Sequence, residues 1–220
     1  MTSNRWPELQ ELTLINETLS SDPRTWQTLG PGDNISGADH NPFFVRASDG
    51  RYYDIAERLG LAEAMCSRGI ATADIDGDGR LDFAVANQWQ QSFVFQNTTP
   101  NPGAFLGLHL RLPVTSPAGK RTVVHRGHPN RATDGPSRPA IGAAATVHLP
   151  DGRRLVAQVD GGTGHSGKRS PDLHFGLGHL NGTTEVRVDL RWRSADGRVR
   201  AETLHLTPDN WQTVLLGAED

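Results

Sequence analysis

The sequence lacks several features that would place the protein in common classes. Cys66 is its single cysteine, which excludes an internal disulfide and fits a reducing compartment. No stretch is apolar over the roughly 18 residues that a membrane-spanning helix needs, and the N-terminal residues lack the basic and apolar regions of a secretory signal. The cytoplasm is therefore the expected location, although a mature secreted form with its signal removed also fits.

The sequence also lacks a large excess of charge of either sign. The formal net charge is −3 and the sequence pI is about 6.3, so neither nucleic acid nor a membrane is expected as a partner. Twenty of the 22 basic residues are arginine, which is typical of a GC-rich coding sequence and points to a bacterial source.

Glycine and proline, in contrast, are abundant. The chain of 220 residues has 24 glycines and 14 prolines and is 35% hydrophobic. This length allows one sizeable core or two small ones, and the composition favours short strands and turns over helices. We therefore expect a mostly β protein.

The clearest chemistry is in the stretch Asp-Ile-Asp-Gly-Asp-Gly-Arg-Leu-Asp at residues 74–82. Asp74, Asp76 and Asp78 would supply side-chain oxygens to a hard cation, Arg80 its backbone carbonyl, and Asp82 a carboxylate directly or through water. The alternative is an acidic turn that binds nothing. Because four carboxylates within nine residues would repel one another without a cation, we favour a Ca²⁺ site.

This stretch does not fit a helix-loop-helix calcium site. The twelfth position of the loop, where such a site needs a bidentate glutamate, is Val85. The residues after Asp82 form an apolar run, which predicts that a strand rather than a helix follows the loop.

The remaining patterns predict three parts. These are an N-terminal arm over 1–25, a blade-like antiparallel sheet with the calcium hairpin over 26–99, and a C-terminal β-sandwich or barrel over 104–217, on which the blade packs. Asp54 and Gly60 bound a short helical turn. Residues 104–112 alternate as in a half-buried strand. The strands are expected at 43–46, 51–54, 69–73, 82–87, 93–97, 104–112, 143–149, 154–160, 185–192, 199–206 and 211–216.

Several of these stretches resemble known families. Residues 69–87 with Phe-Gln-Asn at 95–97 resemble an FG-GAP or VCBS-type repeat, a propeller blade that holds calcium in its Asp-rich hairpin. Arg-Pro-Ala-Ile-Gly-Ala at 138–143, Gly-Gly-Thr-Gly-His at 161–165 and Leu-His-Phe-Gly-Leu-Gly at 173–178 resemble the signatures of the ASPIC/UnbV domain. This domain is found in relatives of cartilage acidic protein and in enediyne-cluster proteins.

Two features depart from these families. Relatives usually carry several repeats, whereas this chain has room for one, which leaves open sheet edges that favour a homo-oligomer unless they are covered. Where many relatives have a Tyr-Leu-Ser-Gln-like sequence, this chain has His-Ser-Gly-Lys-Arg at 165–169.

That departure is a second candidate site. His165, Lys168, Arg169 and His174 could supply a titratable base and two cations for catalysis, and Ser166 could bind a ligand. No nucleophile motif accompanies them. The structural alternative is a tight glycine crossover in which His174 is a core histidine bonded to backbone.

A third candidate is the long loop expected at 113–139. His125, Arg126 and His128 could contact an anionic or aromatic ligand there, or the loop could simply be solvated. Zinc is not expected, because the histidines show no ligand spacing with cysteine.

Two functional classes remain. The first is a module in which structural calcium supports the binding of a small molecule, carbohydrate or protein partner. The second, implied by the enediyne-cluster resemblance, is a small biosynthetic enzyme of bacterial secondary metabolism, a cyclase or similar positioning catalyst. The sequence leaves open whether the protein is an enzyme.

Overall fold

The computed structural model describes residues 40–114, 121–162, 170–180, 182, 184–194 and 196–217, together with Asp22 and Arg24. Strands dominate these residues, no sheet among them closes into a barrel, and the mostly β prediction is confirmed. No helix in this part of the chain is long and apolar enough to cross a membrane.

The chain divides into two compact units. The N-terminal unit comprises the described residues up to Ile70 together with Ala84–Phe93, and the C-terminal unit comprises Ala71–Phe83 and the chain from Val94 onward. The loop 74–82 therefore belongs to the same unit as the C-terminal strands.

The N-terminal unit contains a two-stranded sheet of β1 (Phe44–Arg46) and β2 (Tyr52–Asp54), followed by the single helical turn α3 (Ala56–Leu59). Asp54 Oδ1 accepts a hydrogen bond from the Ala56 N–H at 3.0 Å, and Gly60 ends the turn in the left-handed conformation. The end at Gly60 is thus confirmed, whereas the N-cap position is Ile55 and Asp54 lies one residue before it.

A three-stranded sheet in the order β3-β4-β5 carries the acidic loop. Its strands are β3 (Ser67–Ala73), β4 (Asp82–Asn87) and β5 (Phe93–Phe95). The loop lies between β3 and β4, so the strand-loop-strand prediction is confirmed.

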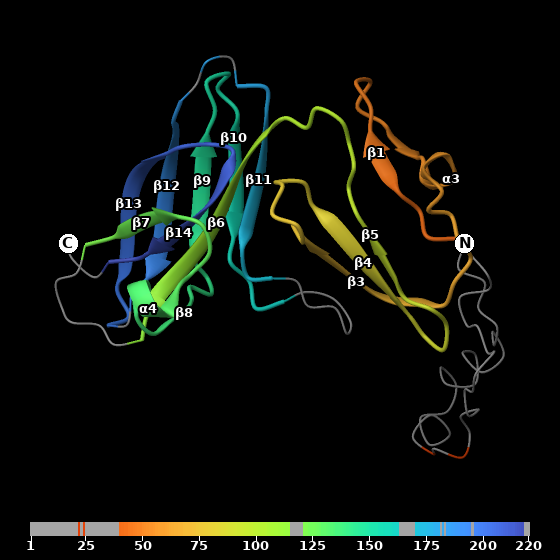
Figure 1. Cartoon of the computed structure of the whole chain (residues 1–220), viewed down its shortest axis with the longest axis horizontal. Helices are drawn as coiled ribbons and strands as arrows, with labels where there is room; N and C mark the ends of the chain where they lie inside the picture. Colours follow the sequence, from red (N-terminus) through yellow and green to blue (C-terminus); the bar gives the residue numbers. More distant parts are fainter. Residues whose placement is uncertain are drawn as a thin grey trace. The chain divides into compact units, whose positions relative to one another are not determined.

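The C-terminal unit contains a sandwich of two sheets (Figure 1). The first sheet has the order β10-β9-β12-β13, and the second has the order β11-β6-β14-β7 with β8 paired to β6. All pairs are antiparallel except β14 with β6. The strands are β6 (Ala104–Pro113), β7 (Val123–Arg126), β8 (Ser137–Pro139), β9 (Ala144–His148), β10 (Arg154–Gln158), β11 (Leu173–Gly178), β12 (Val186–Arg193), β13 (Val199–Leu206) and β14 (Asn210–Leu215).

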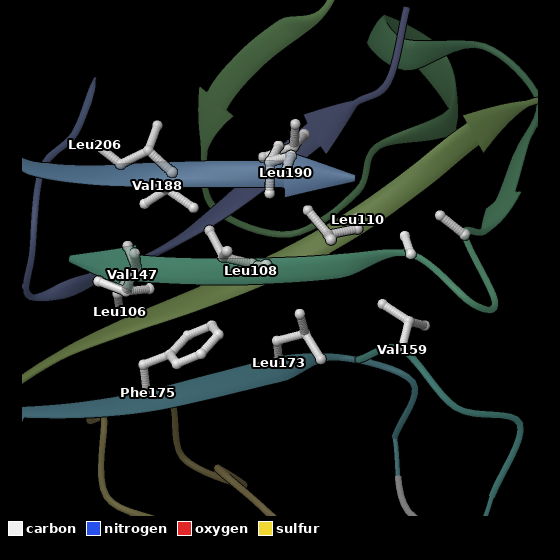
Figure 2. Packing of buried hydrophobic residues seen from close by; sticks show 14 of the residues in the cluster. Leu106, Leu108, Leu110, Val147, Val159, Leu173, Phe175, Val188, Leu190 and Leu206 are labelled. Carbon is white, nitrogen blue, oxygen red and sulfur yellow. The ribbon is translucent and has the colours of Figure 1, made fainter. Parts of the chain in front are cut away.

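The core lies between these two sheets. Alternate residues of each strand point inward, as the period of two requires, so β6 and β12 each contribute every second side chain. Figure 2 shows Leu106, Leu108 and Leu110 of β6 against Val147 of β9 and Phe175 of β11.

Strand β6 differs from the half-buried strand that its alternation predicts. Its outward-facing Gly107 and His109 are buried as well as its inward-facing leucines. The reason is that aromatic side chains of the same unit cover the outer face, as described below.

The segment 113–139 also differs from the expected loop. In its described part, β7 extends the second sheet beside β14, β8 pairs with β6, and α4 (Arg131–Asp134) connects them. Strands of three or four residues that include proline, arginine and histidine are too short to give a periodic signal.

Candidate metal centre

Two glycines shape the acidic loop. Gly77 and Gly79 have φ values of 76° and 86°, a conformation that other residues rarely adopt. The backbone therefore turns sharply at both positions, and the carboxylates on either side of each turn can point toward one centre.

Three carboxylates converge in this loop. Asp74, Asp76 and Asp78 each place one oxygen within 4.8 Å of the others. Backbone N–H groups hold all three: Asp78 and Gly79 donate to the two oxygens of Asp74 at 3.0 and 2.9 Å, Asp78 also donates to Asp76 Oδ1 at 3.3 Å, and Arg80 donates to Asp78 Oδ1 at 2.8 Å. Carboxylate oxygens spaced in this way suit a hard divalent cation such as Ca²⁺.

Arg80 and Gln96 hold the remaining oxygens of the loop. The Arg80 guanidinium pairs with Asp78 Oδ2 and donates to the Asn97 carbonyl at 2.5 Å. Gln96 Nε2 donates to Asp76 Oδ2 at 2.6 Å and thereby lowers the pKa of Asp76. The sequence predicts the Arg80 carbonyl as a ligand, and in the structure Arg80 contributes its side chain and its backbone N–H to the contacts of the loop.

Asp82 lies apart from the converging group. Its side chain is buried, with 2% of the residue exposed, and its two oxygens accept hydrogen bonds from the N–H groups of Ile75 and Asn97 at 2.9 and 2.8 Å. Asp82 therefore ties the start of the loop to the segment after β5. It is not one of the three carboxylates whose oxygens lie within 4.8 Å of one another.

The loop contacts the outer face of the β11-β6-β14 sheet. The Trp211 indole donates from Nε1 to Asp74 Oδ2 at 2.6 Å, and His174 donates from Nε2 to the Gly79 carbonyl at 2.7 Å. The Phe105 ring is so close to Gly79 that a Cβ there would lie 2.2 Å from a ring carbon. We call Phe105, His174 and Trp211 the docking face.

Gly107 makes room for this arrangement. It pairs with Trp211 on β14 and with His174 on β11, and a Cβ at Gly107 would lie 2.2 Å from the indole. Trp211 is not among the site residues that the sequence predicts. A glycine inside an otherwise regular strand was the available signal, because it often marks a close approach of another group.

Two family models match parts of the chain. A family model for the FG-GAP repeat matches residues 68–98, and one described as ASPIC and UnbV matches residues 133–219. The chain joins one FG-GAP repeat to an ASPIC/UnbV domain. Both expected domains are thus confirmed, whereas nothing in these matches supports a cyclase or a role in secondary metabolism. No curated protein matches the chain.

Beside the docking face, the same sheet holds a buried imidazole. His109, 4% exposed, donates from Nδ1 to Asp172 Oδ1 at 2.7 Å and stacks on Trp211 with ring centroids 4.9 Å apart. The His128 ring lies 4.8 Å from the His109 ring. Burial raises the pKa of Asp172, but hydrogen bonds from His109 and Ser170 lower it by more, so the net shift is downward.

The other predicted site residues are distributed as follows. His125 Nε2 lies 2.9 Å from Asp134 Oδ1, and Arg126 is exposed on β7. His174 bonds a backbone carbonyl, as the structural alternative for this residue proposed. His165, Ser166, Lys168 and Arg169 lie outside the described residues.

The hydrogen-bonded Asp172 predicts a pH-dependent contribution to stability. Its lowered pKa means that the contribution is present above the ordinary value of 3.8 and is lost as the pH falls through the folded value. We expect Asp172→Asn to reduce the free energy of unfolding near neutral pH by about 1 kcal/mol, at the low end because the carboxylate is partly exposed. Urea unfolding of both proteins as a function of pH measures the difference, which should decrease below pH 3.8 and vanish once the pH is below the folded pKa of Asp172. A difference that stays constant at every pH would contradict the assignment.

Proposed function

We propose that the protein is a calcium-binding β module in which one Ca²⁺ per chain is held by Asp74, Asp76 and Asp78. The observation that carries this proposal is the convergence of the three carboxylates within 4.8 Å. FG-GAP repeats generally bind calcium, which supports the choice of ion. A bound cation would also offset the repulsion among these carboxylates.

The calcium is proposed to be structural. The polar side chains around the cluster are used to hold the loop and are not available for catalysis. Asp82 accepts hydrogen bonds from two backbone N–H groups, and Arg80 bridges Asp78 and Asn97. A cation at the cluster would add its ligand bonds to these contacts. Because the unfolded chain does not preform such a site, calcium binding would contribute to folding stability.

Recognition of a partner is the role that we propose for the module. The described histidines favour it over catalysis, because His174 is bonded to Gly79, His109 is buried on Asp172, and His125 faces Asp134. Strands β3 and β5 are the edges of the three-stranded sheet, and each could pair with another chain. A protein, carbohydrate or small molecule as partner, a homo-oligomer and a cytoplasmic location all stay predictions.

Isothermal titration of the calcium-free protein with CaCl₂ tests the metal site. We expect one binding event per chain, and we expect Asp78→Asn to weaken it at least tenfold, because the variant removes a charged ligand. Asp151→Asn is the matched control, because Asp151 lies in an exposed turn and pairs with Arg153. No calcium binding by the wild-type protein, or equal binding by Asp78→Asn, would refute the proposal.

A further inference from the structure

The acidic loop at residues 74–82 is the proposed metal loop. Its contacts with the docking face join two segments that are far apart in sequence. Asp74 belongs to the FG-GAP repeat and Trp211 to the ASPIC/UnbV domain, yet Asp74 Oδ2 accepts the Trp211 indole N–H at 2.6 Å. His174, also in the ASPIC/UnbV domain, holds the Gly79 carbonyl on the other side of the loop. The loop is therefore anchored at two points by the second domain.

We propose that Trp211 and His174 are positioning residues for the metal loop, so that the ASPIC/UnbV sheet sets the calcium affinity of the single FG-GAP repeat. This inference rests on the proposed function, because it assumes that the loop binds calcium. Neither side chain is proposed as a ligand. Each acts by fixing a group of the loop, Trp211 the Asp74 carboxylate and His174 the Gly79 backbone.

Trp211 fixes the orientation of the Asp74 carboxylate. With the N–H groups of Asp78 and Gly79, the indole provides three donors to this one side chain, on both of its oxygens. A carboxylate held in this way loses less rotational freedom when a cation binds. Partners of this kind orient ligands, and their removal typically weakens metal binding by about 10–100-fold.

The indole is itself held firmly. One contact is the close packing on Gly107, and another is the stack on His109, whose ring is fixed by Asp172. The direction of the Trp211 N–H is thus set by the packing of two neighbouring strands, β6 and β14. His174 is likewise stacked on Phe105, with ring centroids 5.5 Å apart.

The test is calcium titration of full-length Trp211→Phe. Phenylalanine keeps an aromatic ring on His109 but removes the N–H donor. We expect its Kd for calcium to rise about tenfold or more, while circular dichroism of the calcium-free protein stays that of the wild type. Trp89→Phe is the matched control, because Trp89 is an exposed tryptophan of the N-terminal unit. It should bind calcium as the wild type does.

A lower melting temperature of calcium-free Trp211→Phe with an unchanged calcium Kd would overturn the proposal, because it would show a purely structural role. If Trp211→Phe does not fold, His174→Phe supplies the same test: it keeps a ring on Phe105, removes the donor to Gly79, and should also weaken calcium binding. An unchanged Kd in His174→Phe would then overturn the proposal. Failure of the wild-type protein to bind calcium would instead refute the proposed function.

Terbium gives a spectroscopic readout of the same geometry. Tb³⁺ occupies calcium sites and emits when a nearby indole absorbs the exciting light, so the emission of the wild-type protein should come mainly through Trp211. At saturating Tb³⁺ we expect this emission to fall strongly in Trp211→Phe and to persist in Trp89→Phe. Equal emission from Trp211→Phe and wild type would count against the placement of Trp211 beside the ion.

Discussion

An excess of chelator is expected to lower the melting temperature of the protein by about 5–16 °C relative to saturating calcium. A ligand present at 100–1,000 times its Kd stabilises the folded state by about 2.7–4.1 kcal/mol. For a chain of this size, each kcal/mol shifts the melting temperature by about 2–4 °C. Differential scanning calorimetry with calcium and with excess chelator measures the shift.

The matched control for this experiment is Asp78→Asn. Its melting temperature should depend less on chelator than that of the wild type, because the variant lacks one of the three converging carboxylates and binds calcium more weakly. A wild-type protein that melts at the same temperature with calcium and with chelator would refute structural calcium.

Much of the fold could be predicted from the sequence, because most strands are regular and end at strong turn signals. Strand β12 alternates valine, leucine and tryptophan with charged residues over eight positions, and its inward face is buried as the pattern requires. The acidic loop could also be predicted, since its glycines and carboxylates are close together in the sequence. Features that depend on residues near in sequence were therefore predicted well.

Features that depend on residues distant in sequence were not predicted. The burial of His109 on the outer face of β6 follows from Trp211 and His128, which lie far along the chain. The spacing predicts Asp82 as another ligand, and in the structure both of its oxygens accept hydrogen bonds from backbone N–H groups, those of Ile75 and Asn97. A repeat pattern cannot reveal these backbone contacts.

The docking face also bears on the problem of a single blade. In a propeller, neighbouring blades cover each sheet, whereas this chain has one FG-GAP repeat. Here the loop end of the repeat packs against Phe105, His174 and Trp211 of the C-terminal unit. The described contacts between the repeat and these three side chains are thus made by its acidic loop.

Asp82→Ala is expected to destabilise the protein by about 2–4 kcal/mol even in excess chelator, because each N–H left without an acceptor costs about 1–3 kcal/mol and both lie near the surface. Asp76→Ala is the matched comparison: Asp76 is exposed, and its Oδ2 accepts from the Gln96 side chain. It should change stability little in chelator yet remove most of the stabilisation by calcium.

Urea unfolding of both variants, with calcium and with chelator, separates the two roles. The backbone hydrogen bonds of Asp82 act whether or not metal is bound, so Asp82→Ala should lower the free energy of unfolding in both conditions. A metal ligand stabilises the protein only when the metal is present, so Asp76→Ala should lower the free energy of unfolding only with calcium. If Asp82→Ala instead lost stability only in calcium, Asp82 would be a ligand, and the two backbone hydrogen bonds would have to give way when the ion binds.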